Sequence, residues 1–476
     1  MSDKLSQLIK ARGPIRKAGV IGMGYVGIPA AMLMANVQAI EKVYGFQRAS
    51  NSSGYKIDML NRGECPLKGI EPGLDDLIKK VVSEGKFECT PDFAKIGELD
   101  AICLAIQTPF ANPKDLIPDF GALIDGIRNA GTYLKPGMLV VLESTITPGT
   151  TAVMAREILE KESGLIAGED FALAHAPERV MVGRLLQNIQ EHDRCVGGID
   201  DVSTARAVEL YSPIMTKGRV IPMTSTEAEV TKTTENTLRD LQIAAANQLA
   251  LYCEAMGINF YNVRAGVDSL KGEGITRAML WPGAGVGGHC LTKDTYHLER
   301  GMHMLGGDKL DYPKGEESLY VLARRINDFM PKHMITLTKN ALRTETLKGK
   351  KIALLGWAFM ANTDDARNTP SESYYHLAQS EGAVTTIHDV WVKEFPEIPT
   401  LSFTKTIEET VKGADAVIIL TGHNESKSLD AVQLKLMTGK EKPVIIDGRN
   451  IIDPDTYLGT GWIYRGIGRG DKNNLS

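Results

Sequence analysis

The segment with the clearest chemical potential is a glycine-rich loop that carries a cysteine, a lysine and a carboxylate. It reads Gly-Val-Gly-Gly-His-Cys-Leu-Thr-Lys-Asp over residues 285–294. Cys290 follows small residues, so a ligand can reach it, and the nearby Lys293 favours its thiolate, the nucleophilic form. Asp294 adds a carboxylate four residues after the cysteine. A buried structural cysteine, the alternative interpretation, suits this loop poorly, whereas it suits the remaining cysteines.

Lys232 and Asn236 are four residues apart and would share one face of a helix. Spacing alone favours a solvated helix face for this pair. Thr226-Glu227-Ala228-Glu229 fits a capping box, and no proline or glycine follows until Gly257, which supplies a C-terminal stop. These signals predict a helix of about 30 residues, long enough to bridge two domains.

A second glycine-rich loop lies between a predicted strand and a predicted helix. In such a G-x-G-x-x-G loop the first glycine permits a tight turn, the second lets the backbone approach a pyrophosphate, and the third lets helix and strand pack closely. The N-terminus of the helix then faces the phosphates. This context predicts a dinucleotide site rather than an ordinary glycine-rich turn. The residues expected to bind the dinucleotide are Gly22, Gly24, Tyr25, Val26 and Gly27.

The acidic residue expected about 20 residues further on, at the end of the second strand, is missing. The sequence at that position is Gly45-Phe46-Gln47-Arg48. Gln47 can still hydrogen-bond the adenosine ribose of NAD, whereas Arg48 suits the 2′-phosphate of NADP. These residues favour NAD over NADP and leave both open.

Short apolar runs alternate with helix-like segments in the first third of the chain and again in the last third. The runs interpreted as strands cover residues 17–22, 42–46, 101–106, 139–143, 171–175, 351–355, 384–389, 416–421 and 444–447. Alternation of this kind predicts parallel sheets with helices on both faces. We therefore expect an α/β chain with two Rossmann-like doubly wound domains, joined by a central helical region with one long helix.

Composition and charge exclude several classes of protein. The chain has 54 basic and 59 acidic residues, a net charge of −5 and no block of Lys or Arg, so no nucleic acid and no membrane is an expected partner. Residues 18–40 are uncharged and long enough to span a bilayer, but their glycines and proline argue against it. The six cysteines show no metal-ligand spacing, so we expect no metal. The polar first residues do not read as a signal peptide, which favours the reducing cytoplasm.

Eight motifs in order along the chain resemble those of the UDP-glucose/GDP-mannose dehydrogenase family. They are GMGYVG at 22–27, QTP at 107–109, ESTITPGTT at 143–151, APER at 176–179, AEVTKTTEN at 228–236, GVGGHCLTKD at 285–294, LGWAFMANTDDARNTPS at 355–371 and IDGRN at 446–450. The resemblance implies an NAD-binding domain over 1–222, a central helical dimerisation region with the Cys loop over 223–325, and a UDP-sugar-binding domain over 326–476.

The resemblance implies a four-electron oxidation in which the C6 hydroxyl of a UDP-sugar becomes a carboxylate and two NAD accept hydride. Cys290 would attack the intermediate aldehyde to give a thiohemiacetal, and the second oxidation would give a thioester that water hydrolyses. The loop around Cys290 and the preceding Trp281-Pro282-Gly283 resemble the N-acetylhexosamine branch, whereas residues 291–294 are more like the UDP-glucose branch. We expect a UDP-N-acetylhexosamine of unresolved epimer, used for surface polysaccharide or glycan synthesis, with UDP-glucose as the alternative.

The resemblance also implies roles for single residues. Lys232 and Asn236 would stabilise an oxyanion and hold water, and Asp294 would act with Lys232 in proton transfer. Thr145 would orient that water, and Glu178 would take part in thioester hydrolysis. Further cofactor contacts would come from Gln47, Thr108, Thr145, Lys293 and Arg367. Substrate contacts would come from Glu178, Arg179, Lys232, Asn236, Arg277, Gly287 and Arg449. The family supplies the arginine at 277 from a partner subunit, which implies a homodimer or a higher homo-oligomer.

The sequence departs from the family at several positions. Met360 stands where the family has a lysine, Gln47 replaces the ribose acid, and APERVMVG lacks a second acid that some UDP-glucose enzymes carry. Two other functions therefore stay open. A two-electron dehydrogenase of the hydroxyacid or 6-phosphogluconate type would need no cysteine loop. A catalytically silent nucleotide-sugar-binding regulator is favoured by Met360 and Gln47 and disfavoured by the retained Cys290.

Overall fold

The computed structural model describes residues 3–51, 53–67, 71–112, 116–270, 278–307 and 317–473. Its contacts divide the chain into two units. The first unit is Met1–Glu235 with Tyr296–Tyr312, and the second unit is Asn236–Thr295 with Pro313–Ser476. The three domains expected from the sequence, 1–222, 223–325 and 326–476, stay a prediction.

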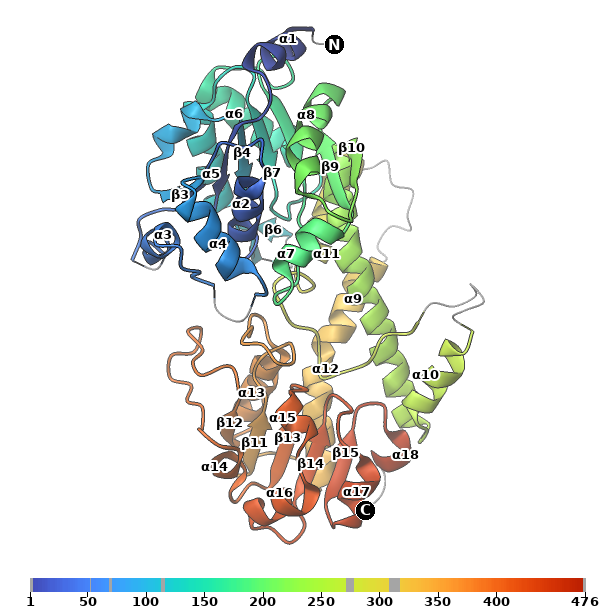
Figure 1. Cartoon of the computed structure of the whole chain (residues 1–476). Helices are drawn as coiled ribbons and strands as arrows, with labels where there is room; N and C mark the ends of the chain where they lie inside the picture. The colour runs from blue at the N-terminus through green and yellow to red at the C-terminus, as the bar shows by residue number, and fades with distance from the viewer. Residues whose placement is uncertain are drawn as a thin grey trace. The chain divides into compact units, whose positions relative to one another are not determined.

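The first unit is built on an eight-stranded sheet (Figure 1). In spatial order its strands are β10 (Val220–Thr224), β9 (Arg194–Gly198), β8 (Ala172–His175), β7 (Leu139–Leu142), β4 (Ala101–Leu104), β1 (Lys17–Ile21), β2 (Lys42–Phe46) and β3 (Phe87–Thr90). Neighbouring strands are parallel except for β8 and β9. The order outward from β1 is that of a doubly wound dinucleotide-binding fold, which confirms the predicted fold class for this unit.

The helices of the first unit lie on both faces of this sheet. They include α1 (Asp3–Arg12), α2 (Gly27–Asn36), α3 (Tyr55–Asn61), α4 (Leu74–Ser83), α5 (Gly121–Tyr133), α6 (Arg156–Ser163), α7 (Leu185–Glu191) and α8 (Asp201–Tyr211). Short helical turns are η1 (Phe93–Glu98), η2 (Thr151–Ala155), η3 (Ser212–Ile214) and η5 (Met302–Gly306). The strands β5 (Phe110–Asn112) and β6 (Ile117–Pro118) form a separate small antiparallel pair. Ala18 and Val20 of β1 belong to one apolar core layer, and Ile21 belongs to the other. The alternation buries both faces, as parallel sheets require.

The uncharged run at residues 18–40 is part of this core. Its first residues form β1, the glycine-rich loop follows, and the next segment is α2, whose residues 27–35 are all buried. Within the described part of the chain, no helix is long and apolar enough to cross a membrane. The lack of charge therefore reflects a buried strand and a buried helix.

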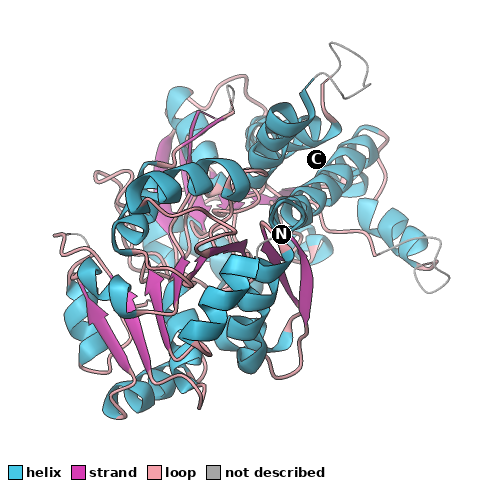
Figure 2. Cartoon of the chain, turned by 90° about the horizontal axis from the view of Figure 1, so that it is seen from above, coloured by secondary structure: helices cyan, strands magenta, loops and turns pink. Residues whose placement is uncertain are grey.

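The second unit contains a five-stranded parallel sheet in the order β12 (Val384–His388), β11 (Lys351–Leu355), β13 (Ala416–Ile419), β14 (Val444–Asp447) and β15 (Ile463–Gly466). Its helices include α10 (Phe260–Asp268), α12 (Leu319–Leu342), α13 (Pro370–Ser380), α14 (Ile407–Val411), α15 (Asn424–Lys427), α16 (Ala431–Thr438), α17 (Pro454–Gly459) and α18 (Gly470–Asn473). Helices flank the strands of the sheets (Figure 2). The second predicted Rossmann-like sheet is confirmed.

The long helix α9 (Ser225–Ala255) has 31 residues, close to the predicted length. Its capping box, however, lies two residues earlier than predicted. The backbone N–H of Thr224 donates to Glu227 Oε2 at 2.7 Å, and the N–H of Glu227 donates back to Thr224 Oγ1 at 3.3 Å. The predicted partner, Glu229, is fully buried and binds a different loop. The boundary between the two units falls within α9 and within α11 (Asp294–Gly301).

Candidate active site

The predicted site residues of the first unit follow the carboxyl ends of its parallel strands. Ligands of open α/β sheets bind at this edge. The residues concerned are Gly22 after β1, Gln47 after β2, Thr108 after β4, Thr145 after β7 and Glu178 after β8. Residues from five separate segments are therefore gathered at one edge by the parallel topology.

The glycine-rich loop after β1 requires its glycines for distinct reasons. Gly22 has φ +101°, and a Cβ on it would meet the carbonyl oxygen of Ala105 at 2.5 Å. A Cβ on Gly27 would lie 1.9 Å from the carbonyl oxygen of Gly22, so only glycine allows this closeness of turn and helix. Gly24 faces open space. The first and third glycines thus serve the turn and the packing, and the second leaves room for a ligand.

A cavity of about 450 Å³ opens beside this loop. It is lined by the loop, by the segment after β2 and by α5, including Gly22, Gly24, Gln47, Ile106 and Asp125. Its size is that of a small-molecule site. The N-terminus of α2, whose dipole favours an anion such as a pyrophosphate, follows the loop directly. Of the predicted cofactor residues, Gly22, Gly24 and Gln47 belong to this lining, and the others do not.

Thr108 and Thr145 instead join the loops that follow β4 and β7. The hydroxyl of Thr108 donates to the carbonyl oxygen of Thr145 at 2.5 Å. The turn that follows is held by α9, because Glu229 accepts hydrogen bonds from the backbone N–H groups of Gly149 at 2.5 Å and Thr151 at 2.8 Å. Burial raises the pKa of Glu229 to about 7 despite these donors. Lys232, one turn further along α9, is also buried.

Glu178 belongs to a buried ion network rather than standing alone. Arg194 on β9 lies between two carboxylates: it binds Glu178 through Nη1 and Glu143 through Nη2, the latter at 3.0 Å. Tyr211 donates to the same oxygen of Glu143 at 2.7 Å, and the Arg194 guanidinium lies 4.0 Å from the Tyr211 ring centre. Glu178 also accepts from the backbone N–H of Arg179 at 2.7 Å. A single guanidinium thereby positions both acids.

In the second unit, the turn after Cys290 brings three predicted residues together. The carbonyl oxygen of Cys290 accepts from the N–H groups of Lys293 at 3.1 Å and Asp294 at 2.9 Å. Asp294 is fully buried and accepts from Asn236 Nδ2 at 2.5 Å and from Lys293 Nζ at 3.1 Å. The Lys293 ammonium, expected beside the thiolate and the dinucleotide, is thus directed at the Asp294 carboxylate.

The glycines before Cys290 are packed against the loop that follows β11. A Cβ on Gly287 would lie 2.6 Å from the Cβ of Phe359, and Gly288 has φ +93°. The N–H of Gly288 donates to the carbonyl oxygen of Arg367 at 2.9 Å, and Asn368 Nδ2 donates to the carbonyl oxygen of Gly288 at 3.2 Å. The cysteine loop and the 356–368 loop therefore form one structure, and glycine is the residue that permits it.

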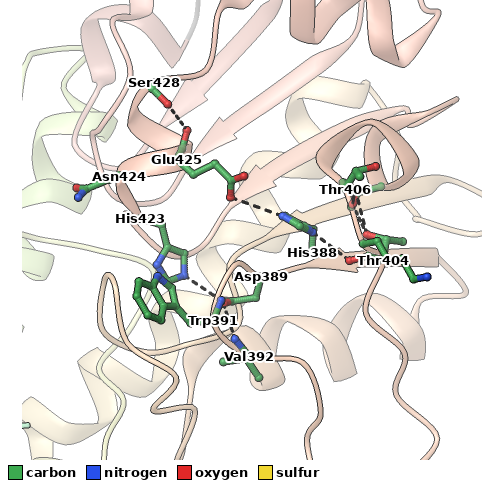
Figure 3. A network of polar contacts seen from close by, with 12 residues as sticks. His388, Asp389, Trp391, Val392, Thr404, Thr406, His423, Asn424, Glu425 and Ser428 are labelled. Carbon is green, nitrogen blue, oxygen red and sulfur yellow. Dashed lines mark hydrogen bonds and ion pairs between the residues drawn. The ribbon is translucent and has the colours of Figure 1, made fainter. Parts of the chain in front are cut away.

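The 356–368 loop is itself anchored by a buried Asp–His pair (Figure 3). His423 Nε2 lies 3.0 Å from Asp389 Oδ2, which also accepts from the N–H groups of Trp357 at 2.5 Å and Ala358 at 3.0 Å. His423 Nδ1 accepts from the N–H of Asn362 at 2.9 Å. Burial alone would raise the pKa of Asp389, but these donors lower it to about 2. Three loops at the carboxyl edge of the second sheet are thus tied together.

The predicted arginines have different surroundings. Arg367 is clamped by Asp365, with Nε at 2.9 Å from Oδ1 and Nη2 at 2.5 Å from Oδ2. Arg449 follows β14, donates through Nε to the carbonyl oxygen of Leu420 at 2.6 Å, and has its pKa lowered to about 10 by burial. A Cβ on Gly283 would lie 2.9 Å from Nη1 of Arg449. Arg277 lies outside the described residues.

Four residues of these networks were missed by sequence reasoning: Glu229, Arg194, Asp389 and His423. Glu229 belongs to the motif at 228–236, but the prediction that it caps α9 was wrong. Arg194 gave no signal, because its carboxylate partners are 16 and 51 residues away. Asp389 ends a predicted strand, a position from which ligand-edge chemistry could have been inferred. Among the described residues, no cluster of His, Cys, Asp and Glu could hold a metal.

Comparison with known proteins gives matches along most of the chain. Models of the UDP-glucose/GDP-mannose dehydrogenase family match three regions: the NAD binding domain over residues 16–215, the central domain over 226–312 and the UDP binding domain over 353–454. The matched regions contain both glycine-rich loops, α9 and the Asp389–His423 pair.

Individual relatives are similar over nearly their full lengths. The chain is 36% identical over 458 residues to the UDP-N-acetyl-D-mannosamine dehydrogenase of Pyrococcus horikoshii, covering 96% of this chain and 100% of the relative. It is 30% identical over 443 residues to the NDP-N-acetyl-D-galactosaminuronic acid dehydrogenase of Ralstonia nicotianae, covering 92% and 96%. The crystal structure of NDP-N-acetyl-D-galactosaminuronic acid dehydrogenase from Methanosarcina mazei Go1 has a TM-score of 0.92 at 67% identity, covering 100% of both chains.

Proposed function

The chain belongs to the UDP-glucose/GDP-mannose dehydrogenase family, and we propose that its substrate is a UDP-N-acetylhexosamine, oxidised at C6 to the uronic acid. It is an NAD-dependent nucleotide-sugar dehydrogenase. The choice of an N-acetylhexosamine is supported by the names of its relatives, which refer to N-acetyl-mannosamine and N-acetyl-galactosaminuronic acid. The product would serve the synthesis of a surface polysaccharide or glycan. UDP-glucose is the alternative substrate.

The residues around the first cavity fit the cofactor. Gly24 faces open space, the positive end of the α2 dipole would favour a pyrophosphate, and the cavity extends to Gln47 for the adenosine ribose. Bound NAD supplies the hydride acceptor for both oxidations. Gly22 and Gly27 hold the loop in the geometry that allows this approach.

The covalent part of the proposal assigns the nucleophile to Cys290. Its Sγ would add to the C6 aldehyde carbon while the carbonyl oxygen takes a proton, which gives a thiohemiacetal. Loss of a hydride and a proton then gives a thioester. Water would add to the thioester carbon, the C–S bond would break, and the carboxylate and the thiolate would be released. The sugar would stay covalently bound to Cys290 from the thiohemiacetal to the thioester, so no free aldehyde would be released.

The observation that carries this proposal is the hydrogen bond from Asn236 to the fully buried Asp294, at the end of the turn of Cys290. Asp294 accepts from both Asn236 and Lys293, so a carboxylate is held ready to accept a proton. Lys232, one turn before Asn236 on α9, would stabilise an oxyanion. Thr145 and Glu178 would orient and activate the hydrolytic water. A catalytically silent regulator would have no need for this arrangement.

Substrate binding would involve the carboxyl edge of the second sheet. Arg449 is half-buried beside Gly283, and a guanidinium matches the geometry of a pyrophosphate. Gly287 would let the sugar approach the backbone next to Cys290, and Arg179 would add a charge beside Glu178. Arg277 of a second subunit would complete the site in a homodimer. Arg367 and Lys293 would contact the dinucleotide.

The test uses purified protein, NAD and a panel of UDP-sugars, with NADH followed by absorbance. We expect turnover with a UDP-N-acetylhexosamine and two NADH per sugar. UDP-glucose serves as the matched comparison, because it differs from UDP-N-acetylglucosamine only in having a hydroxyl in place of the acetamido group at C2. Preference for UDP-glucose would overturn the substrate assignment. One NADH per sugar with free aldehyde would overturn the covalent mechanism.

A further inference from the structure

The corner of the cofactor cavity at the end of β2 has a neutral side chain where an acidic one is expected. At the position of the ribose-binding acid stands Gln47, whose amide is held by the protein at both ends. Its Oε1 accepts from the N–H of Met23 at 3.3 Å, and its Nε2 donates to Ser53 Oγ at 2.9 Å. The side chain therefore joins the glycine-rich loop to the segment after β2. It brings no negative charge to the place where the adenosine 2′ position is read.

Cationic and hydroxyl groups surround this amide. Arg48, Ser50, Ser53 and Lys56 all line the cavity. The Ser50 and Ser53 hydroxyls lie 2.8 Å apart, and Lys56 Nζ donates to the carbonyl oxygen of Met23 at 2.8 Å. Burial lowers the pKa of Lys56 because it disfavours the charged ammonium. A nearby anion would stabilise that ammonium. The donors in this corner thus match an anionic ligand group.

The Arg48 guanidinium can turn to a ligand without losing a strong interaction. It lies 3.6 Å from Asp125 on α5, and the two side chains are 60% and 51% exposed. Ion pairs this exposed contribute little to stability. A phosphate dianion, which accepts a bidentate hydrogen bond from arginine, competes well with such a partner.

We propose that this corner binds a 2′-phosphate on the adenosine ribose, so that the chain accepts NADP as well as NAD. Arg48 is the principal donor, and the Ser50 and Ser53 hydroxyls are the secondary donors. A carboxylate at position 47 would accept from the ribose hydroxyls and repel the phosphate, whereas the neutral Gln47 permits both ligands. The inference concerns the cofactor half alone and does not depend on the sugar or on Cys290.

The test measures binding to the full chain by calorimetry, without sugar and without turnover. The probes are adenosine 2′,5′-bisphosphate and 5′-AMP, which differ by the 2′-phosphate alone. We expect the bisphosphate to bind about tenfold tighter or more at low salt, as one charge-assisted bidentate contact gives. The preference should shrink at about 0.5 M salt and below about pH 6, where the phosphate becomes a monoanion. Equal or weaker binding of the bisphosphate by the unaltered chain would overturn the proposal.

Three variants locate the effect. Arg48→Gln should reduce the preference for the bisphosphate to about one, and retention of the full preference would remove Arg48 from the site. Gln47→Glu should reverse the preference, because Glu keeps the contacts to Met23 and Ser53 while adding a charge that repels the phosphate.

The matched control is Arg16→Gln, since Arg16 is also 60% exposed and pairs with a carboxylate, Glu41, at 3.0 Å. It precedes β1, at the opposite end of the strand, and should leave both affinities unchanged. Thermal unfolding verifies that each variant is folded.

Discussion

The side-chain amide of Asn236 donates a hydrogen bond of 2.5 Å to Oδ2 of the fully buried Asp294. The other oxygen, Oδ1, accepts from the ammonium of Lys293 at 3.1 Å. A buried carboxylate with an amide on one side and an ammonium on the other is fixed in position. This arrangement follows directly after the turn of Cys290 and links α9 to the cysteine loop within the second unit.

Asp294→Asn tests this arrangement, because it keeps the shape and removes the charge. The new amide would place an N–H group against the N–H of Asn236 or against the Lys293 ammonium. We expect kcat to fall by about 100-fold or more while KM for the sugar changes only a few-fold, since the role proposed for Asp294 is in proton transfer. Steady-state NADH formation measures both. The control is Asp328→Asn, whose side chain is 60% exposed. An unchanged kcat for Asp294→Asn would contradict the proposed role.

Replacing Cys290 by serine should separate the two oxidations. A serine hydroxyl is a far weaker nucleophile than a thiolate, so no thioester would form. We expect one NADH per sugar, followed by a stall, in a single-turnover measurement with the preferred UDP-sugar. Cys65→Ser is the control, because Cys65 is also partly exposed but belongs to the segment before α4. Two NADH per sugar from Cys290→Ser would exclude the thiol from the reaction.

Arg194→Met should destabilise the first unit strongly. The substitution preserves much of the volume but leaves the buried Glu143 and Glu178 without their shared cation. Loss of one partner from a buried ion pair costs about 3–5 kcal/mol, which urea unfolding at pH 7 would measure. Arg219→Met, at an 82% exposed arginine that pairs with Asp193, should cost less than about 1 kcal/mol. Equal effects of the two substitutions would show that the buried network contributes nothing to stability.

Acid should destabilise the protein through His175. Burial lowers the pKa of this histidine to about 3, below its unfolded value of about 6.5. Between these values the unfolded chain binds the additional proton, so this contribution is complete above about pH 6.5 and is lost as the pH falls. Its slope is up to ~1.4 kcal/mol per pH unit. His175→Leu should flatten the dependence of unfolding free energy on pH over this range, whereas a substitution at the exposed His192 should not. Parallel curves for wild type and His175→Leu would refute this.

Asp389→Asn should loosen the loop that supports the cysteine turn. Both oxygens of Asp389 accept backbone N–H groups: Oδ2 from Trp357 and Ala358, and Oδ1 from Trp391 and Val392. An asparagine must turn its own NH₂ toward one of these pairs of donors, at about 1–3 kcal/mol. Hydrogen exchange should become faster at Trp357 and Ala358, or at Trp391 and Val392. The 44% exposed Glu425, changed to Gln, is the control (Figure 3). Unaltered exchange at all four amides would disprove the anchoring role.

Local patterns predicted much of this chain correctly. Apolar runs located nine strands of the two sheets, and the absence of proline and glycine after residue 224 predicted the length of α9. The glycine-rich loop at 22–27 was predicted as a turn between strand and helix, and the positive φ of Gly22 and the packing of Gly27 give the reason. Four further strands of these sheets, β3, β9, β10 and β15, were missed. Of these, β10 is largely exposed and carries Pro222, which weakens its strand signal.

The sequence by itself determined the elements, the reaction class and the candidate chemical groups, because these depend on residues close together in the chain. Only the tertiary structure decided which groups meet. It paired Asn236 with Asp294, Glu229 with the turn at Gly149, and Arg194 with two acids. It also placed Arg48 and the two serines around a neutral Gln47. Hydrogen bonds form over about 3 Å between segments far apart in the chain, and packing, rather than local pattern, selects the partners.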